Sequence, residues 1–209
     1  MSKKLKDAYT LSSKEDTINL YKYWSKNYDK DFAVRNNYKS PQKVVKYFLK
    51  YSKQNDTPVL DVGAGTGLIA VYLKKKISIP IHAIDISKEM LDQSRQKKCY
   101  EKIIVADLNK KLNVANCTYG AVVSSGTFTH GHLEANVLKE LLRVVKPNGL
   151  FVISIHQSFF TKGGFKNQLE SFGPMINNLK IHKVYIYGKI GSKIFNKDKV
   201  LITTFRKNC

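Results

Sequence analysis

The chain has 209 residues, 43% of them hydrophobic and 25% charged, which is typical of a globular protein with one buried core. No apolar run reaches the roughly 20 residues that a membrane span requires, and the basic N-terminus lacks the apolar segment of a signal peptide. Cys99, Cys117 and Cys209 have neither metal nor redox spacing. We therefore expect a single domain over residues 1–209, located in the cytoplasm, without a metal site.

The net charge of +20 is compatible with nucleic-acid binding, but the kind of basic residue argues against it. Only 4 of the 36 basic residues are arginine, the residue whose planar guanidinium reads phosphates and bases best. The lysines are scattered, with no basic run longer than Lys74 to Lys76. We expect neither a nucleic-acid nor a membrane partner, although a diffuse positive field can still bind polyanions weakly.

Residues 1–39 are expected to form an N-terminal cap segment. Within it, residues 17–32 are rich in aromatic side chains, including Trp24 and Tyr28, and predict one or two short helices that fold back over the domain. These aromatic side chains either attach the segment to the core or face a ligand. Ser40-Pro41 then predicts a helix start, with the serine hydroxyl as its cap.

The most informative stretch runs from Val59 to Ala70. It predicts a buried parallel strand, a turn with three glycines at Gly63, Gly65 and Gly67, and a helix from Leu68. The missing Cβ atoms let backbone pass close to a ligand, which favours a nucleotide-type cofactor. An ordinary tight turn is the alternative.

The glycine spacing separates two cofactor classes. Dinucleotide enzymes usually show G-x-G-x-x-G/A, with a small residue where the helix packs on the strand. Here the third glycine comes one residue early, and Leu68 occupies that place. This spacing argues against a dinucleotide.

Carboxylates close the next two predicted strands. The strand over residues 80–85 ends at Asp85, which lies near the distance from the turn at which an acidic residue accepts two ribose hydroxyls. Ser87 follows as a helix cap, so Asp85 can also be read as a helix-start charge. The strand over residues 102–106 is followed by Asp107, which is otherwise a common loop residue.

A fourth strand over residues 119–125 leads into the loop Gly126–His132. Because ligands of open α/β sheets bind outside the carboxyl ends of the strands, this loop is expected to line the pocket. An amphipathic helix over residues 138–145 and a fifth strand over residues 150–155 follow.

The last part of the chain predicts a lid and a hairpin. Residues 157–180 are polar and aromatic, with a flexible point at Gly163-Gly164, and we expect them to form a lid insertion at the pocket mouth. Residues 184–187 and 200–205 alternate and predict an antiparallel pair.

Four motifs in this order resemble those of class I methyltransferases that depend on S-adenosylmethionine (SAM). They are Asp61-Val-Gly-Ala-Gly-Thr-Gly67, Ile84-Asp-Ile-Ser-Lys-Glu-Met-Leu91, Ala106-Asp-Leu108 and Leu141-Leu-Arg-Val-Val-Lys-Pro-Asn-Gly149. Residues 8–11, 21–29 and 124–132 are similar to the methyltransferase-like family of the Williams-Beuren region and its bacterial relatives. The resemblance implies a Rossmann-like α/β fold, with a mostly parallel seven-stranded sheet, a C-terminal antiparallel hairpin and helices on both faces.

The resemblance also implies SAM as the cofactor and a set of residues that bind it. The glycine turn is expected to hold the methionine end, Asp85 the ribose, and Asp107 with Leu108 the adenine. Aromatic faces attract cations, so Trp24 or Tyr28 would suit a position near the sulfonium. The full expected set comprises Trp24, Tyr28, Asp61, Gly63, Ala64, Gly65, Gly67, Asp85, Ile86, Met90, Asp107, Leu108, Ser125, Gly126 and Thr127.

Methyl transfer requires a general base only if the acceptor keeps its proton. His130 and His132 are the candidates, with His156 a weaker third, and a role in shaping the loop is equally open for the first two. The leading hypothesis is a methyltransferase acting on a small-molecule acceptor. The alternatives are a nucleic-acid or protein methyltransferase and a SAM-binding protein without catalysis. The fourth strand lacks the Asn/Asp-Pro-Pro-Tyr sequence expected for methylation of planar amino groups.

Overall fold

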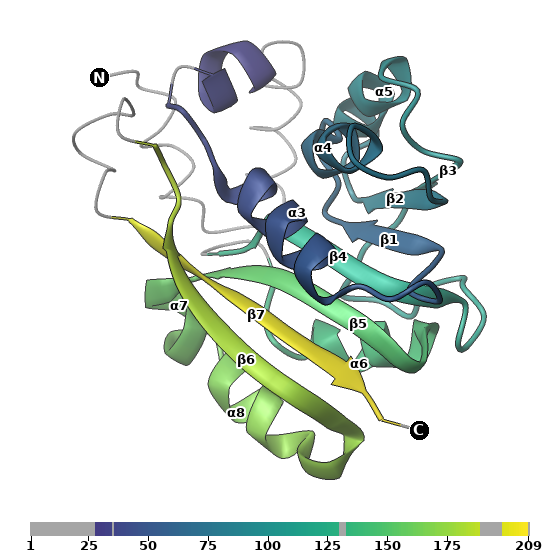
Figure 1. Ribbon diagram of the computed structural model, residues 1–209, viewed down its shortest axis with the longest axis vertical. Coiled ribbons are helices and arrows are strands. Elements are labelled where there is room, and N and C mark those ends of the chain that lie inside the picture. Colours follow the sequence, from purple (N-terminus) through teal and green to yellow (C-terminus); the bar gives the residue numbers. More distant parts are fainter. Residues whose placement is uncertain (1–27, 35, 130–132, 189–197, 209) are drawn as a thin grey trace.

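Figure 1 shows the computed structural model, which describes residues 28–34, 36–129, 133–188 and 198–208. The described elements are η1 (Tyr28–Val34), α3 (Ser40–Tyr51), β1 (Val59–Val62), α4 (Leu68–Lys74), β2 (Ile81–Asp85), α5 (Lys88–Gln96), β3 (Lys102–Val105), β4 (Tyr119–Phe128), α6 (Val137–Val144), β5 (Val145–His156), α7 (Gln157–Lys162), α8 (Phe165–Ser171), η2 (Gly173–Met175), β6 (Ile176–Tyr185) and β7 (Lys199–Lys207).

The strands form one seven-stranded sheet in the order β3-β2-β1-β4-β5-β7-β6. The pairs from β3 to β5 are parallel, whereas β7 is antiparallel to both β5 and β6. The strand order reverses direction between β1 and β4, and such a switch point is where open α/β sheets bind ligands. The fold class expected from the motifs is confirmed.

Helices cover both faces of the sheet, because the central strands are apolar on both sides (Figure 1). On one face, α3 and α4 pack Val44, Phe48 and Leu73 against alternate residues of the sheet such as Val59 and Val123. On the other face, α6 and α8 pack residues such as Leu141 and Phe165 against Leu60 and Val122. The strand β1 and most of β4 between them are therefore buried, whereas the edge strands β3 and β6 are partly exposed.

Two local expectations need correction. Ser40 does not cap α3, because its hydroxyl bonds to Ser154 instead, whereas Pro41 does stand in the first turn. The strand β6 begins at Ile176, eight residues before the expected strand, because its pairing with β7 continues to Lys207. Residues 157–175 form α7, α8 and η2, and Phe165 is fully buried against Phe128.

No helix within the described part of the chain is long and apolar enough to cross a membrane. Within the same residues, His, Cys, Asp and Glu side chains do not gather into a group that could hold a metal ion.

Candidate cofactor and acceptor site

A cavity of about 980 Å³, including its open mouth, lies at the carboxyl ends of β1, β2, β3 and β4. The residues that line it are Tyr28, Tyr38, Pro41, Asp61, Gly63, Ala64, Gly65, Thr66, Leu68, Ile69, Asp85, Ile86, Met90, Asp107, Leu108, Asn109, Ser125, Gly126, Thr127 and Leu133.

The glycine turn brings bare backbone to the cavity wall. Gly63, Gly65 and Gly67 have φ values of +65°, +53° and +86°, a region that side chains with a Cβ rarely adopt. A Cβ on Gly63 would lie 2.0 Å from Oγ1 of Thr127, whereas a Cβ on Gly65 would have no atom within 4 Å. Gly65 therefore faces open space, and Gly63 is packed against β4.

Asp61 contributes a buried carboxylate at the end of β1, 1% exposed. Its Oδ2 accepts a hydrogen bond of 2.6 Å from the phenol of Tyr100, while its Oδ1 has no partner among the described residues. Burial raises the pKa of Asp61 from 3.8 to about 7, opposed by the Tyr100 hydrogen bond and aided by the nearby charge of Asp85. A cation beside this Oδ1 would therefore stabilise the ionised form of Asp61.

Asp85 closes β2 and is held by backbone. The amide of Gly65 donates to its Oδ2 over 2.8 Å, and the amide of Ser87 donates to its Oδ1 over 2.9 Å. Burial raises the pKa of Asp85, and these backbone hydrogen bonds oppose the rise. Asp85 therefore also supports the start of α5, as its alternative interpretation expects, through its hydrogen bond from Ser87. The Ser87 side chain in turn caps α5 by accepting a hydrogen bond from the backbone amide of Met90. Because each carboxylate oxygen has two lone pairs, acceptor capacity remains for a ligand.

The third wall segment follows β3. Asp107 accepts from the backbone amide of Asn109 over 3.0 Å, which closes a tight turn, and Leu108 is buried beside it. This turn begins the long connection between β3 and β4. Contacts with the rest of the domain have to hold that connection in place.

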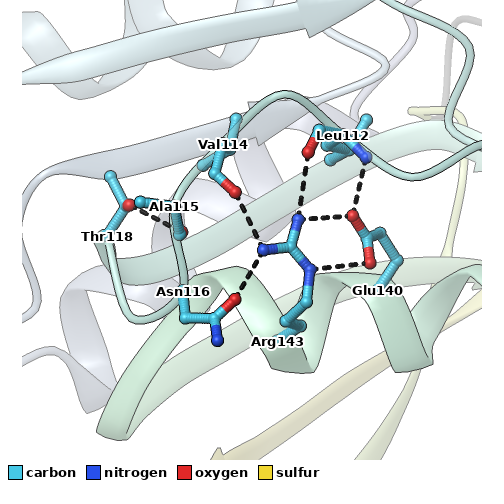
Figure 2. A network of polar contacts seen from close by, with 7 residues as sticks. All are labelled: Leu112, Val114, Ala115, Asn116, Thr118, Glu140 and Arg143. Carbon is cyan, nitrogen blue, oxygen red and sulfur yellow. Dashed lines mark hydrogen bonds and ion pairs between the residues drawn. The ribbon is translucent and has the colours of Figure 1, made fainter.

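Arg143 of α6 holds the connection, as Figure 2 shows. Its guanidinium donates to the carbonyls of Leu112 and Val114 and to the side chain of Asn116, at 2.7 to 3.1 Å. Glu140 accepts two hydrogen bonds from Arg143 and one from the backbone amide of Leu112. The Leu-Leu-Arg motif is therefore a clamp on the segment that carries Asp107 and Leu108.

A chain of hydroxyl groups lies at the β4 side of the cavity. The oxygens of Tyr38 and Ser125 are 3.2 Å apart, Ser125 donates to Ser40 over 2.9 Å, and Ser40 donates to Ser154 over 3.3 Å. Burial raises the pKa of Tyr38, so its phenol stays protonated at neutral pH. Among the described residues, this side of the cavity, with Pro41 and Leu133, is neutral.

The charge of the cavity is opposite to that of the whole chain. Its described lining holds three carboxylates, of Asp61, Asp85 and Asp107, and no lysine, arginine or histidine. The chain carries 36 basic and 16 acidic residues. The cavity therefore suits a cationic ligand better than a polyanionic one.

Every expected cofactor residue that the structure describes lines this cavity except Gly67. Trp24, His130 and His132 lie outside the described residues. Gly67 faces α5 instead, since a Cβ there would lie 3.0 Å from the ring of Tyr100 and 3.2 Å from Ser94. His156 does not line the cavity, and its ring bonds to Ser158 over 2.8 Å. None of residues 157–180 is among the described lining residues, and the lid expected over them stays a prediction.

Seven lining residues were not anticipated: Tyr38, Pro41, Thr66, Leu68, Ile69, Asn109 and Leu133. Thr66 and Leu68 belong to the glycine stretch itself and could have been included with it. Tyr38 had no such signal, because its place depends on how the start of α3 crosses the end of β4.

Residues 60–153 match the family model described as a methyltransferase domain. Human methyltransferase-like protein 27 is 27% identical over 154 residues, which cover 72% of this chain and 62% of that protein. The ribosomal protein L11 methyltransferase of Aquifex aeolicus is 26% identical over 145 residues, which cover 69% of this chain and 54% of that protein. The chain thus spans less than two thirds of the length of these curated relatives.

The fold is shared with a solved structure described as a SAM-dependent methyltransferase from Aquifex aeolicus. The TM-score is 0.61 at 21% identity, over 88% of this chain and 97% of that one.

Proposed function

We infer that this chain transfers the methyl group of SAM to a small-molecule acceptor. The chain belongs to the class I SAM-dependent methyltransferases through its methyltransferase domain at residues 60–153. The observation that carries the proposal is the unpartnered, buried Oδ1 of Asp61 in a cavity whose only described charges are carboxylates. SAM is a cation at its sulfonium and at its amino group, so this lining fits it.

The same lining argues against a dinucleotide. A pyrophosphate needs amides or cations that compensate its charge, whereas here Asp61 and Asp85 stand at the glycine turn and the amide of Gly65 already donates to Asp85. Repulsion between a pyrophosphate and these carboxylates would weaken binding. The early third glycine and the charges thus favour the same cofactor.

Each part of the cavity has a proposed role. Asp61 binds the amino group of the methionine end, where the open face of Gly65 admits the ligand close to backbone. Asp85 accepts the ribose hydroxyls, and Asp107 and Leu108 contact the adenine. Tyr28 lines the cavity and supplies an aromatic face for the sulfonium. Trp24 is retained in the same role.

SAM supplies an activated methyl group whose thioether leaves without protonation. The residues of this chain then have to hold the acceptor in line with that methyl group and exclude water. The neutral side of the cavity, with Tyr38, Pro41, Ser125 and Leu133, is the proposed acceptor side. His130 and His132 remain the proposed general bases for an acceptor that keeps its proton.

Two observations support a small acceptor over a macromolecule. The positive charges of the chain are absent from the described cavity lining, and the described residues of the acceptor side offer hydroxyl and apolar groups. A protein acceptor is the competing proposal, because one relative is described as a ribosomal protein L11 methyltransferase. That the whole chain forms one domain also stays a prediction.

Labelling with SAM that carries a tritiated methyl group separates these proposals. The protein is incubated with heat-treated cell extract, and label is measured in the small-molecule, protein and nucleic-acid fractions. We expect a labelled small molecule other than SAM itself, which forms only when the protein is present. Label confined to protein or nucleic acid would overturn the acceptor class, and tight SAM binding without label in any fraction would favour a non-catalytic SAM-binding protein.

A further inference from the structure

Asp29 of η1 connects three parts of the chain that are distant in sequence. The hydroxyl of Thr66, in the glycine turn, donates to its Oδ1 over 2.6 Å. The ammonium of Lys97, at the C-terminal cap of α5, donates to its Oδ2 over 2.5 Å. Both carboxylate oxygens of Asp29 are therefore engaged.

A third hydrogen bond closes these contacts into a ring. Lys97 also donates to the backbone carbonyl of Thr66 over 2.6 Å. Charge-assisted hydrogen bonds of this kind are stronger than neutral ones. The side chains of Lys97 and Asp29 are only 24% and 38% exposed, and Thr66 is 3% exposed, so the ring is partly shielded from water. Lys97 is also favourably placed at the negative end of the α5 dipole.

The ring lies directly behind the cavity wall. Thr66 lines the cavity, and so does Tyr28, which precedes Asp29 in the chain. Fixing the carboxylate of Asp29 against the glycine turn therefore fixes the backbone from which the ring of Tyr28 projects.

We propose that Asp29 is a positioning residue that holds Tyr28 at the cavity wall and slows the release of bound SAM. The proposal rests on the proposed function, because SAM is the ligand whose release it describes. Loss of the Asp29 contacts removes a support of the cavity wall that SAM touches once bound, so it changes the dissociation rate more than the association rate.

The test is the dissociation rate constant of SAM, measured by competition in stopped flow. We expect Asp29→Ala and Lys97→Met to accelerate dissociation, the former about tenfold, which is the scale of one lost charge-assisted hydrogen bond. Lys97→Arg keeps a cationic donor at this position and should dissociate as the parent does. The matched control is Lys88→Met, which breaks the exposed Lys88–Asp92 ion pair on the same helix and should have no effect.

A double substitution separates positioning from general loosening. If Asp29 acts through Tyr28, the pair Asp29→Ala and Tyr28→Leu should release SAM no faster than Tyr28→Leu alone. Additive effects, or a parent rate in Asp29→Ala, would overturn the proposal while SAM binding by the parent stands. A parent protein that binds no SAM would instead overturn the proposed function, and this inference with it.

Discussion

The phenol of Tyr100 donates to Oδ2 of Asp61 over 2.6 Å and leaves Oδ1 of the same buried carboxylate without a partner among the described residues. Burial raises the pKa of Tyr100 well above its ordinary value, so the phenol stays a donor. The pair therefore fixes the orientation of a carboxylate whose other oxygen can serve a ligand.

This pair predicts a pH dependence of stability. The pKa of Asp61 is about 7 in the fold against an ordinary value of 3.8, so the folded state holds the proton longer than the unfolded state. The contribution of Asp61 to the free energy of unfolding is present at low pH and is lost as pH rises toward about 7. Asp85, whose pKa is also raised, contributes with the same sign.

Denaturant unfolding of the parent and of Asp61→Asn across this pH range isolates the Asp61 contribution. The variant should gain stability relative to the parent as pH rises from about 4 to about 7, by up to about 4 kcal/mol. An unchanged difference over the range would show that Asp61 titrates normally. SAM, as a cation, should lower the pKa of Asp61 and flatten the slope of the parent.

A Cβ at Gly65 tests whether the open side of the glycine turn is the ligand side. Gly65 has φ +53° and Gly173 of η2 has φ +44°, and a Cβ at either position would meet no atom within 4 Å. Both alanine variants should lose about 1 to 2 kcal/mol of stability through the positive φ. Only Gly65→Ala should lose SAM affinity by calorimetry, and equal affinities in both variants would contradict this.

The Arg143 clamp predicts coupling between α6 and the segment after β3. Arg143→Met removes hydrogen bonds to Leu112, Val114, Asn116 and Glu140, and should cost about 1 to 3 kcal/mol of stability. Because the segment carries Asp107 and Leu108, affinity for adenosine should fall as well.

The same clamp has a pH signature opposite to that of Asp61. The hydrogen bonds from Arg143 lower the pKa of Glu140 below its ordinary value of 4.5, so this stabilisation is present above that value and is lost as pH falls through the folded-state pKa. In Arg143→Met this acid-side loss should shrink. An acid transition identical to that of the parent would argue against the clamp.

Arg206 and Asp56 form a buried ion pair that joins β7 to the loop before β1, with both Asp56 oxygens bonded at 2.8 and 2.9 Å. Arg206→Met leaves a buried carboxylate unpaired and should cost about 3 to 5 kcal/mol. Adding Asp56→Asn should recover part of that loss in denaturant unfolding. The folded fraction should bind SAM as the parent does, because neither residue lines the cavity.

Much of the fold could be predicted because its signals are local. The Val59–Val62 strand, the helix from Leu68 and the cap at Ser87 follow from periodicity and turn chemistry over a few residues. The order of the motifs indicates the methyltransferase family, and the comparisons support both its fold and a methyltransferase domain over residues 60–153.

The remainder depends on contacts between distant residues. Ser40 reads as a helix cap, yet its hydroxyl joins Ser125 and Ser154 from β4 and β5. Residues 157–175 read as an insertion because their sequence is mostly polar and aromatic and does not show which side is buried. That side becomes evident only in the fold, where Phe165 packs on Phe128. The start of β6 depends on β7, and Tyr38 reaches the cavity through the placement of α3.

The most direct measurement is a calorimetric titration of the parent and of Asp85→Ala with SAM, with a nicotinamide dinucleotide as the competing ligand. The account predicts that the parent binds one SAM, that it does not bind the dinucleotide, and that Asp85→Ala weakens SAM binding about tenfold to a hundredfold through the lost ribose hydrogen bonds. A parent that ignores SAM but binds the dinucleotide would contradict it.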